Sequence, residues 1–373
     1  MRFRIAAQLV VVLVLLGLLA AGTTGVFVYG ISRDLLIHSA KEKLLTLTHD
    51  LSRRVVSARQ QVVFDLQILA ENPDTLSILD RRNTHADAEK RLTGLFTQIM
   101  EAHPSYHRIQ LISSHQYGLE QIRVERRNAR IVSASEEERQ EKGHYAYVSE
   151  TLNQPRRAAY MSRITARPEP ALDVEDRPTT QLAMPVYLPA QDDARGVVVI
   201  TLDIRHEFSR LSENTPHGLD LFLANGQGDI LIHPDGSRTF GFDLGRRALI
   251  QEEFPPLAAL LNGQQERVLF ETEASGPSKS AGEARVAAFV RQGIEIASGD
   301  NWLYVGLSQP LANVLEDSRQ LGQSILRSMA LVLPACLIIA ILLARIISRP
   351  INRLREAAQR FSQGERLGDL PIR

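Results

Sequence analysis

Two long apolar runs constrain this chain more than any other feature of its sequence. Residues 328–344 (SMALVLPACLIIAILLA) contain no charged side chain, and a basic stretch, RIISRPINRLREAAQRFSQGE, follows directly. Residues 5–30 are equally free of charge, and as a helix they would rise about 39 Å against roughly 30 Å of bilayer hydrocarbon. A cleaved signal peptide is the alternative for this first run, but the apolar cores of such peptides span only about 7–15 residues. We therefore predict two membrane-spanning helices, at 5–30 and 328–346.

Arginines flank both runs on their outer sides: Arg2, Arg4, Arg345, Arg349, Arg353 and Arg355. Because basic residues favour the cytoplasmic side of a membrane, we expect both termini, 1–4 and 347–373, in the cytoplasm. Residues 31–327 would then lie on the other side. The sequence is therefore interpreted as a two-pass protein of a bacterial inner membrane with a large periplasmic domain.

Composition excludes several classes of function. The 43 basic and 43 acidic side chains balance, and no basic patch interleaved with aromatics indicates a nucleic-acid partner. Cys336 is the single cysteine, which rules out a disulfide framework and a zinc–cysteine site. No HExxH, P-loop, GxSxG or GxGxxG motif occurs, so we expect no catalysis and no cofactor. His233 lies in a turn and is assigned as a surface or capping residue.

The region between the apolar runs begins with a long helical pattern. Residues 32–69 contain no proline or glycine, and apolar side chains recur every three or four positions as on one face of a helix. The predicted stripe consists of Leu44, Thr48, Leu51, Val55, Ala58, Val62, Leu66 and Leu69. The sequence Asn72-Pro73-Asp74 would end this helix, and a second helix is predicted at 86–102.

Strand patterns then follow in two sets. In the first set, strands are predicted at 108–113, 120–126, 160–164, 181–187 and 196–204, with a proline-rich loop at 167–180. In the second set, an Asn-Gly turn at 225–226 joins two short apolar runs into a hairpin, and further strands are predicted at 267–273, 285–290 and 302–307. We therefore predict two α+β modules, a distal one at about 71–205 and a proximal one at about 206–310. An exit helix would follow at 311–327.

This order resembles the double Cache sensor domain, in which one long helix supports two PAS-like antiparallel sheets in tandem. The resemblance is carried by GVVVITLDI (196–204), LFLANGQGDILIHPDG (221–236) and NWLYVGLSQPLANVL (301–315). The closing stretch resembles the beginning of a HAMP linker, which passes movement from membrane helices to a cytoplasmic output domain. The expected fold class is therefore α+β: two transmembrane helices flanking a double Cache domain, and then the start of a HAMP coiled coil.

The HAMP resemblance rests on Pro350 and on a heptad-like stripe. Proline suits the first turn of a helix, where its missing N–H costs little. The stripe, Ile351, Leu354, Ala358 and Phe361, would be the seam of a parallel coiled coil and so implies a homodimer. An amphipathic helix lying on the membrane surface is the alternative. The second HAMP helix does not follow, so we expect a fragment of a longer receptor.

The resemblance implies a small extracytoplasmic ligand, held by the distal module. Arginine would bind an organic acid or the carboxylate of an amino acid, with tyrosine or serine hydroxyls beside it. The candidate ligand-binding residues are Arg123, Tyr147, Tyr160, Ser162, Arg163 and Asp203. Of these, Asp203 would hold an ammonium group, and strand alternation places Tyr160 and Ser162 on the face opposite Arg163.

Three functions are compatible with this sequence. The first is a transmembrane receptor whose missing output domain is a histidine kinase or a diguanylate cyclase. The second is a chemoreceptor. The third is a membrane-anchored binding protein, or partner-interaction protein, without an output domain of its own.

Overall fold

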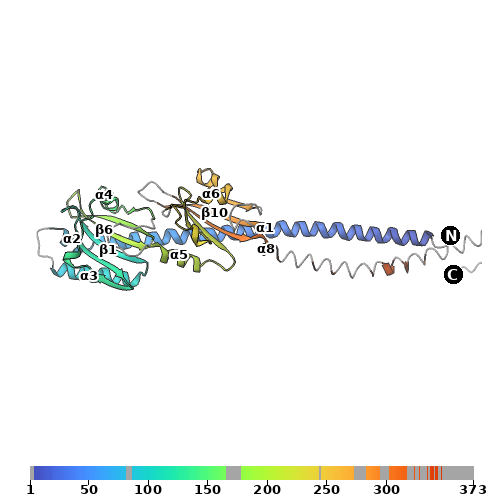
Figure 1. The fold of residues 1–373 in the computed structure, drawn as a ribbon, viewed down its shortest axis with the longest axis horizontal. Helices are drawn as coiled ribbons and strands as arrows, with labels where there is room; N and C mark the ends of the chain where they lie inside the picture. Colours follow the sequence, from blue (N-terminus) through green and yellow to red (C-terminus); the bar gives the residue numbers. More distant parts are fainter. Residues whose placement is uncertain are drawn as a thin grey trace, which may run out of the picture. The chain divides into compact units, whose positions relative to one another are not determined.

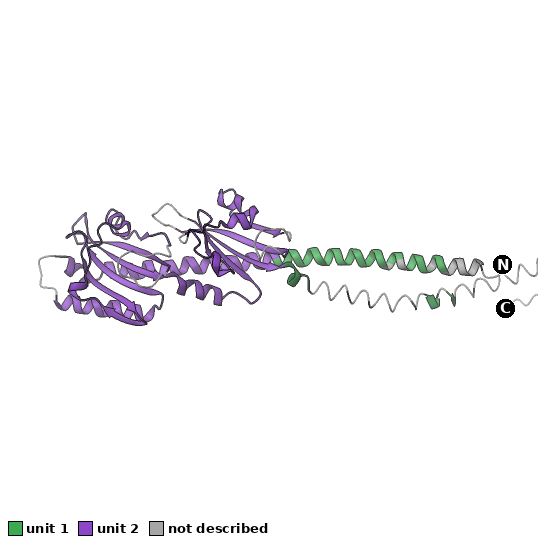
Figure 2. Ribbon diagram, viewed as in Figure 1, with its two compact units in different colours: residues 1–40, 311–373 green, residues 41–310 purple. Residues whose placement is uncertain are grey.

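The computed structural model describes residues 4–80, 86–164, 178–242, 245–272, 283–294 and 302–316, with isolated positions between 323 and 346. It divides into two compact units, residues 1–40 with 311–373 and residues 41–310 (Figure 2). Of the predicted exit helix, the described part contains α8 (Leu311–Val314). Most of the second apolar run and all of the HAMP-like stripe, from Pro350 to Phe361, lie outside the described residues.

A single helix, α1 (Arg4–Ala70), joins the first apolar run to the rest of the chain. Among the described residues it is the one helix long and apolar enough to cross a membrane, and its apolar part lies near the N-terminus. Large side chains in that part, such as Leu19 and Phe27, are 68% and 69% exposed, as expected for a surface that faces lipid.

The apolar stripe predicted on α1 is mostly buried in the second unit. Leu44, Thr48, Leu51, Val62, Leu66 and Leu69 are all at most 5% exposed. Val55 is half-buried and Ala58 is exposed, so the stripe loses its cover over one turn. After Ala70 the chain turns, and the Asn72 side chain accepts a hydrogen bond from the Asp74 N–H, capping α2 (Pro73–Leu79).

The distal module is built on a six-stranded antiparallel sheet of order β3-β2-β1-β6-β5-β4 (Figure 1). The strands are β1 (Tyr106–Ser113), β2 (Glu120–Arg127), β3 (Arg130–Ser133), β4 (Tyr160–Met161), β5 (Thr179–Tyr187) and β6 (Ala194–Asp203). The apolar run of β6 lies between β1 and β5, which explains why it reads as a fully buried strand. The strand predicted at 160–164 is shorter than expected.

Helices cover both faces of this sheet. One face packs against α1 and against α3 (Ala86–Ala102), whose buried side chains are Ala88, Leu92, Phe96 and Met100. The hydroxyl of Tyr106 in β1 donates to Asp65 of α1 over 2.5 Å. The opposite face is covered in part by α4 (Ala146–Leu152), which contacts β4, β5 and β6.

The proximal module repeats this plan with five antiparallel strands in the order β8-β7-β11-β10-β9. Helix α5 (Ile204–Glu213) leads into it. The strands are β7 (Asp220–Asn225), β8 (Ile230–Ile232), β9 (Arg267–Thr272), β10 (Arg285–Gly293) and β11 (Trp302–Pro310). The predicted hairpin is confirmed, because β7 pairs with β8 across Asn225 and Gly228.

One face of the proximal sheet is filled by aromatic side chains. Phe222, Phe254, Phe270 and Phe289 have ring centroids 5.1–6.0 Å apart. They pack beneath α6 (Ile250–Glu253), η3 (Pro255–Leu257) and α7 (Ala258–Leu261). Gly306 in β11 leaves room for this core, since a Cβ there would lie 2.0 Å from the Phe289 ring.

Of the two roles predicted for His233, surface or capping residue, the surface role is wrong. His233 is 5% exposed, because β8 leads it under α6, where its Nε2 lies 3.0 Å from Glu253. Its Nδ1 accepts from the Asp235 N–H at 2.8 Å. Burial alone would raise the pKa of Glu253, but the hydrogen bond to His233 and the charge of Arg238 outweigh it and hold that pKa below its usual value.

Candidate functional site

The register of the distal sheet gathers polar side chains on the face that α4 covers in part. Residues opposite each other on neighbouring strands share a face. Gln110 pairs with Arg123 and Arg108 with Glu125, and Arg108 also pairs with Thr201, which in turn pairs with Gln181. Together they form a polar belt across the sheet: Arg108, Gln110, Glu120, Arg123, Glu125, Ser162, Thr179, Gln181 and Thr201.

The best-buried part of the belt is an ion-pair network. Glu120 has no exposed surface and Arg123 is 5% exposed. The Arg123 Nη1 donates to Glu120 Oε2 at 3.0 Å, and Gln110 Nε2 donates to Oε1 of the same carboxylate at 2.5 Å. Burial would raise the pKa of Glu125, but the charges of Arg108, Arg123 and Arg127 lower it below its ordinary value. The Glu125 carboxylate is therefore charged at neutral pH.

Two buried polar atoms of the belt make no hydrogen bond in the described part of the structure. They are Arg123 Nε and Thr179 Oγ1. The Arg123 Nε lies 3.8 Å from Glu125, which is an ion-pair distance but too long for a hydrogen bond. Buried polar groups in proteins are nearly always satisfied. One donor and one hydroxyl on the same sheet face thus make no hydrogen bond among the described residues.

An apolar cluster lies beside the belt on the same face. Tyr160 of β4 packs with Tyr147 and Val148 of α4 over small and branched residues of the sheet: Ile112, Ala183, Val197 and Val199. Both tyrosines are at most 5% exposed. Burial, assisted by the charge of Glu150, raises the pKa of Tyr160, so its hydroxyl is protonated and able to donate.

The predicted site residues fall into two groups. Tyr147 and Tyr160 lie together in the apolar cluster, and Arg123 and Ser162 belong to the polar belt. By contrast, Arg163 is exposed beyond the end of β4. The carboxylate of Asp203 accepts from the backbone N–H groups of Arg205 and His206, so it caps α5.

Sequence reasoning missed the rest of the belt: Arg108, Gln110, Glu120, Glu125, Thr179, Gln181 and Thr201. The alternation of polar and apolar residues in RIQLI (108–112) and IRVE (122–125) was the available signal. No group of histidine, cysteine, aspartate and glutamate in the described residues could hold a metal ion.

The two sheets on one long helix, with helices over their opposite faces, define a double Cache sensor domain. The sequence profile of the bacterial histidine kinase sensor domain family matches residues 38–274. The chain therefore belongs to this family, whose members are sensor domains rather than catalytic ones.

Solved structures agree on the fold. The extracellular domain of a candidate histidine kinase, vpHK1S-Z8, has a TM-score of 0.60 at 14% identity, over 75% of this chain and 98% of that one. A domain from a Vibrio parahaemolyticus protein assigned to the sensory box/GGDEF family has a TM-score of 0.59 at 14% identity, and the match covers 75% of this chain and 99% of that one. The ligand-binding domain of the Campylobacter jejuni chemoreceptor Tlp3, solved with L-valine, reaches 0.53 at 10% identity, over 77% and 98%. No curated protein matches the sequence.

Proposed function

We propose that this chain is the sensing part of a two-pass membrane receptor, and that its distal module binds a small molecule between the sheet and α4. The unsatisfied Nε of Arg123 is the observation that carries this proposal. A guanidinium with one free N–H, beside an apolar cluster capped by two tyrosines, suits a ligand with an anionic group and an apolar body.

The favoured ligand is an organic acid or an amino acid. Its carboxylate would accept from Arg123 Nε, with the hydroxyls of Thr179 and Ser162 on the same face and Tyr147 and Tyr160 against its apolar part. Tlp3, a relative by fold, was solved with L-valine, which supports this class. Since Asp203 caps α5 and Arg163 is exposed, the proposal rests on the other four predicted residues.

Binding would be passed on through the second apolar run. Residues 328–346 would cross the membrane, with both termini in the cytoplasm, and two chains would pair through Ile351, Leu354, Ala358 and Phe361 behind Pro350. The output domain would be a histidine kinase or a diguanylate cyclase. A ligand shifts such an equilibrium only by its different affinity for the two states, typically about 1–3 kcal/mol.

Ligand binding is tested on the full chain in lipid nanodiscs. The midpoint of thermal unfolding is measured in the presence of carboxylates, amino acids, amines and sugars. A ligand at 100 times its dissociation constant stabilises the folded protein by about 2.7 kcal/mol. We expect a carboxylate to raise the midpoint and Arg123→Lys, which keeps the charge but removes Nε, to abolish the shift. Arg130→Lys, at an exposed position of β3, is the matched control. A carboxylate shift that persists in Arg123→Lys, or silence across the panel, contradicts the proposed site.

Pairing of the chains is tested by disulfide crosslinking in a Cys336→Ser background. Leu354→Cys lies on the predicted seam and Arg355→Cys beside it. Crosslinking in membranes should be much stronger at position 354. Equal crosslinking at the two positions would contradict a coiled-coil seam.

A further inference from the structure

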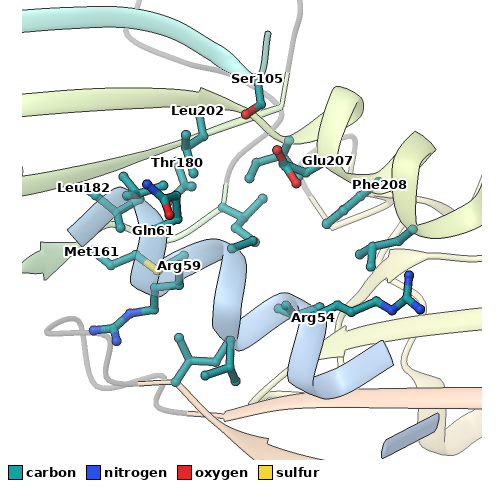
Figure 3. Close-up of a pocket in the computed structure, with 18 of the residues that line it drawn as sticks. Arg54, Arg59, Gln61, Ser105, Met161, Thr180, Leu182, Leu202, Glu207 and Phe208 are labelled. Carbon is teal, nitrogen blue, oxygen red and sulfur yellow. The ribbon is translucent and has the colours of Figure 1, made fainter. Parts of the chain in front are cut away.

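A cavity lies in residues 41–310, away from the polar belt. Its volume is about 350 Å³, and it is bounded by α1, α5, the α1-facing side of the distal sheet, and strands β7 and β11 of the proximal sheet. Figure 3 shows Thr180, Leu182 and Leu202 of the distal sheet and Phe208 of α5 around the same stretch of α1. Both modules and the helix that links them therefore contribute to one space.

The cavity lies at the turn of α1 where the residues of the apolar stripe are no longer buried. Val55 and Ala58, the two stripe residues that no sheet buries, both line it. The rest of the wall is mainly apolar, including Val62, Ile204, Leu211, Leu223 and Leu303. Protein interiors leave few voids larger than a water molecule, and a space of this size falls within the range of small-molecule sites.

One corner of the cavity is acidic. Glu207 lines it from the first turn of α5. Behind the wall, Asp65 accepts from Tyr106, and burial together with the Asp65 hydrogen bond and the charges of Asp65 and Glu207 raises the pKa of the Tyr106 hydroxyl. Glu207 lies 3.7 Å from Arg210, whose side chain is 62% exposed, so this pair neutralises it only weakly.

The wall also carries four basic side chains, Arg54, Arg59, His103 and Arg210. Of these, the His103 Nε2 lies 3.5 Å from Asp65 behind the wall. Arg54 donates to Asp50 at 3.0 Å on the surface of α1. Figure 3 shows the guanidinium groups of Arg54 and Arg59 extending in opposite directions from α1, while Glu207 lies across the cavity from that helix. The arrangement therefore favours a cationic head group at Glu207 and an apolar body against the stripe.

We propose that this cavity is a second ligand site, which takes a small apolar amine with its ammonium group at Glu207 and its body against Val55, Ala58, Leu182 and Leu211. Because its wall comes from both sheets, α1 and α5, an occupant stabilises one arrangement of the two modules. It thereby changes the response to a ligand at the polar belt. The effect on that response rests on the proposed function, but amine binding to this cavity is measured directly and is tested without it.

The test uses three probes of similar size and different charge on the full chain in lipid nanodiscs: 2-phenylethylamine, 2-phenylethanol and 3-phenylpropanoate. Binding is measured by isothermal titration, with empty nanodiscs subtracted. We expect the amine to bind at least fivefold more tightly than the alcohol, and the acid to bind most weakly. Glu207→Gln should reduce the amine to the affinity of the alcohol and leave the alcohol unchanged.

Two further variants locate the site. Leu211→Trp fills the cavity and should abolish binding of both the amine and the alcohol, whereas Glu213→Gln, at an exposed position of the same helix, should change neither. Arg123→Lys should leave amine binding intact, which separates this site from the polar belt. The proposal is overturned if Glu207→Gln leaves amine affinity unchanged, if a folded Leu211→Trp protein binds the amine normally, or if the acid binds best.

Discussion

The two modules share a plan but use the outer faces of their sheets differently. In the proximal module, four phenylalanines fill the space under α6, η3 and α7, and Gly306 admits the Phe289 ring. In the distal module, the corresponding face bears the polar belt and only a partial apolar cluster under α4. The proximal sheet face is thus a closed apolar core, whereas the distal sheet face is largely polar and is covered by α4 only in part.

The buried polar groups differ in the same way. In the proximal module, His233, Glu253 and Arg238 bond to one another beneath α6. In the distal module, Arg123 Nε and Thr179 Oγ1 are buried without a hydrogen bond among the described residues, and in the proximal module the same holds for Gln251 Oε1 and Arg291 Nε. The two distal atoms differ in that both belong to the polar belt on one sheet face. The proposed ligand site rests on this difference.

The largest expected effect is on the proximal core. Phe289→Ala removes a ring that contacts three other phenylalanines, and should lower the free energy of unfolding by about 3–5 kcal/mol. The single tryptophan, Trp302, lies in β11 of the same module, so its fluorescence reports this unfolding directly. If the aromatic core is only structural, the folded variant keeps its affinity for a distal ligand. A selective loss of that affinity would break the division of roles.

The next effect is in the distal network. Glu120→Gln removes the buried charge that pairs with Arg123, and should cost about 3 kcal/mol because the guanidinium loses the charge of its hydrogen-bonded partner. Glu138→Gln is the control, since that carboxylate is 43% exposed where it pairs with Arg127, and it should cost much less than Glu120→Gln. Thermal unfolding followed by circular dichroism measures both. Equal costs would mean that the network is not buried.

A third prediction concerns how the distal sheet is held on α1. Tyr106→Phe removes the hydroxyl that donates to the 7%-exposed Asp65, and should cost about 2 kcal/mol as a hydrogen bond to a charged group. Tyr117→Phe, at a position 84% exposed, should leave stability unchanged. Chemical unfolding curves of the two variants give the difference. A neutral Tyr106→Phe substitution would show that packing alone holds this contact.

Local signals predicted most of the fold. The run GVVVITLD became β6 because a strand buried on both faces needs no alternation, and Asn225 marked the turn of the β7–β8 hairpin. Helix α4 was not assigned because its seven residues show too little periodicity. Helix α5 was missed because it starts directly at the end of β6, where Asp203 serves as its cap rather than as a ligand group.

The site could be predicted only in part, because its geometry depends on strand pairing. Arg123 and Glu120 are three residues apart, which in a regular strand places them on opposite faces. A register shift between Leu111 and Ile112 brings them to the same face. Thr201 and Gln181 join the belt through pairings with strands far away in the sequence. The types of residue alone pointed to arginine and tyrosine as ligand-binding side chains. Which residues contact one another depends on the strand register and on the irregularity in the pairing of β1 with β2.

The smallest expected effect is a pH dependence of the distal module. The pKa of Glu125 is lowered in the folded protein, where burial is outweighed by Arg108, Arg123 and Arg127, and returns to about 4.3 on unfolding. Its stabilisation is therefore complete above about pH 4.3 and is lost as the pH falls through the lower folded pKa, with a slope of at most about 1.4 kcal/mol per pH unit.

Glu125→Gln should flatten the decrease of the unfolding free energy on acidification below about pH 4.3, while Glu136→Gln, an exposed glutamate of η1 (Glu136–Glu138), should not. Unfolding midpoints measured by circular dichroism between pH 3 and pH 6 compare the two. Glu253 has a lowered pKa as well, so the proximal module keeps its own acid dependence in the Glu125→Gln variant. If the pH dependence that remains in Glu125→Gln is also seen in unfolding followed by Trp302 fluorescence, each module has its own acid-sensitive carboxylate. Loss of the whole pH dependence in Glu125→Gln would instead mean that the distal network alone controls acid stability.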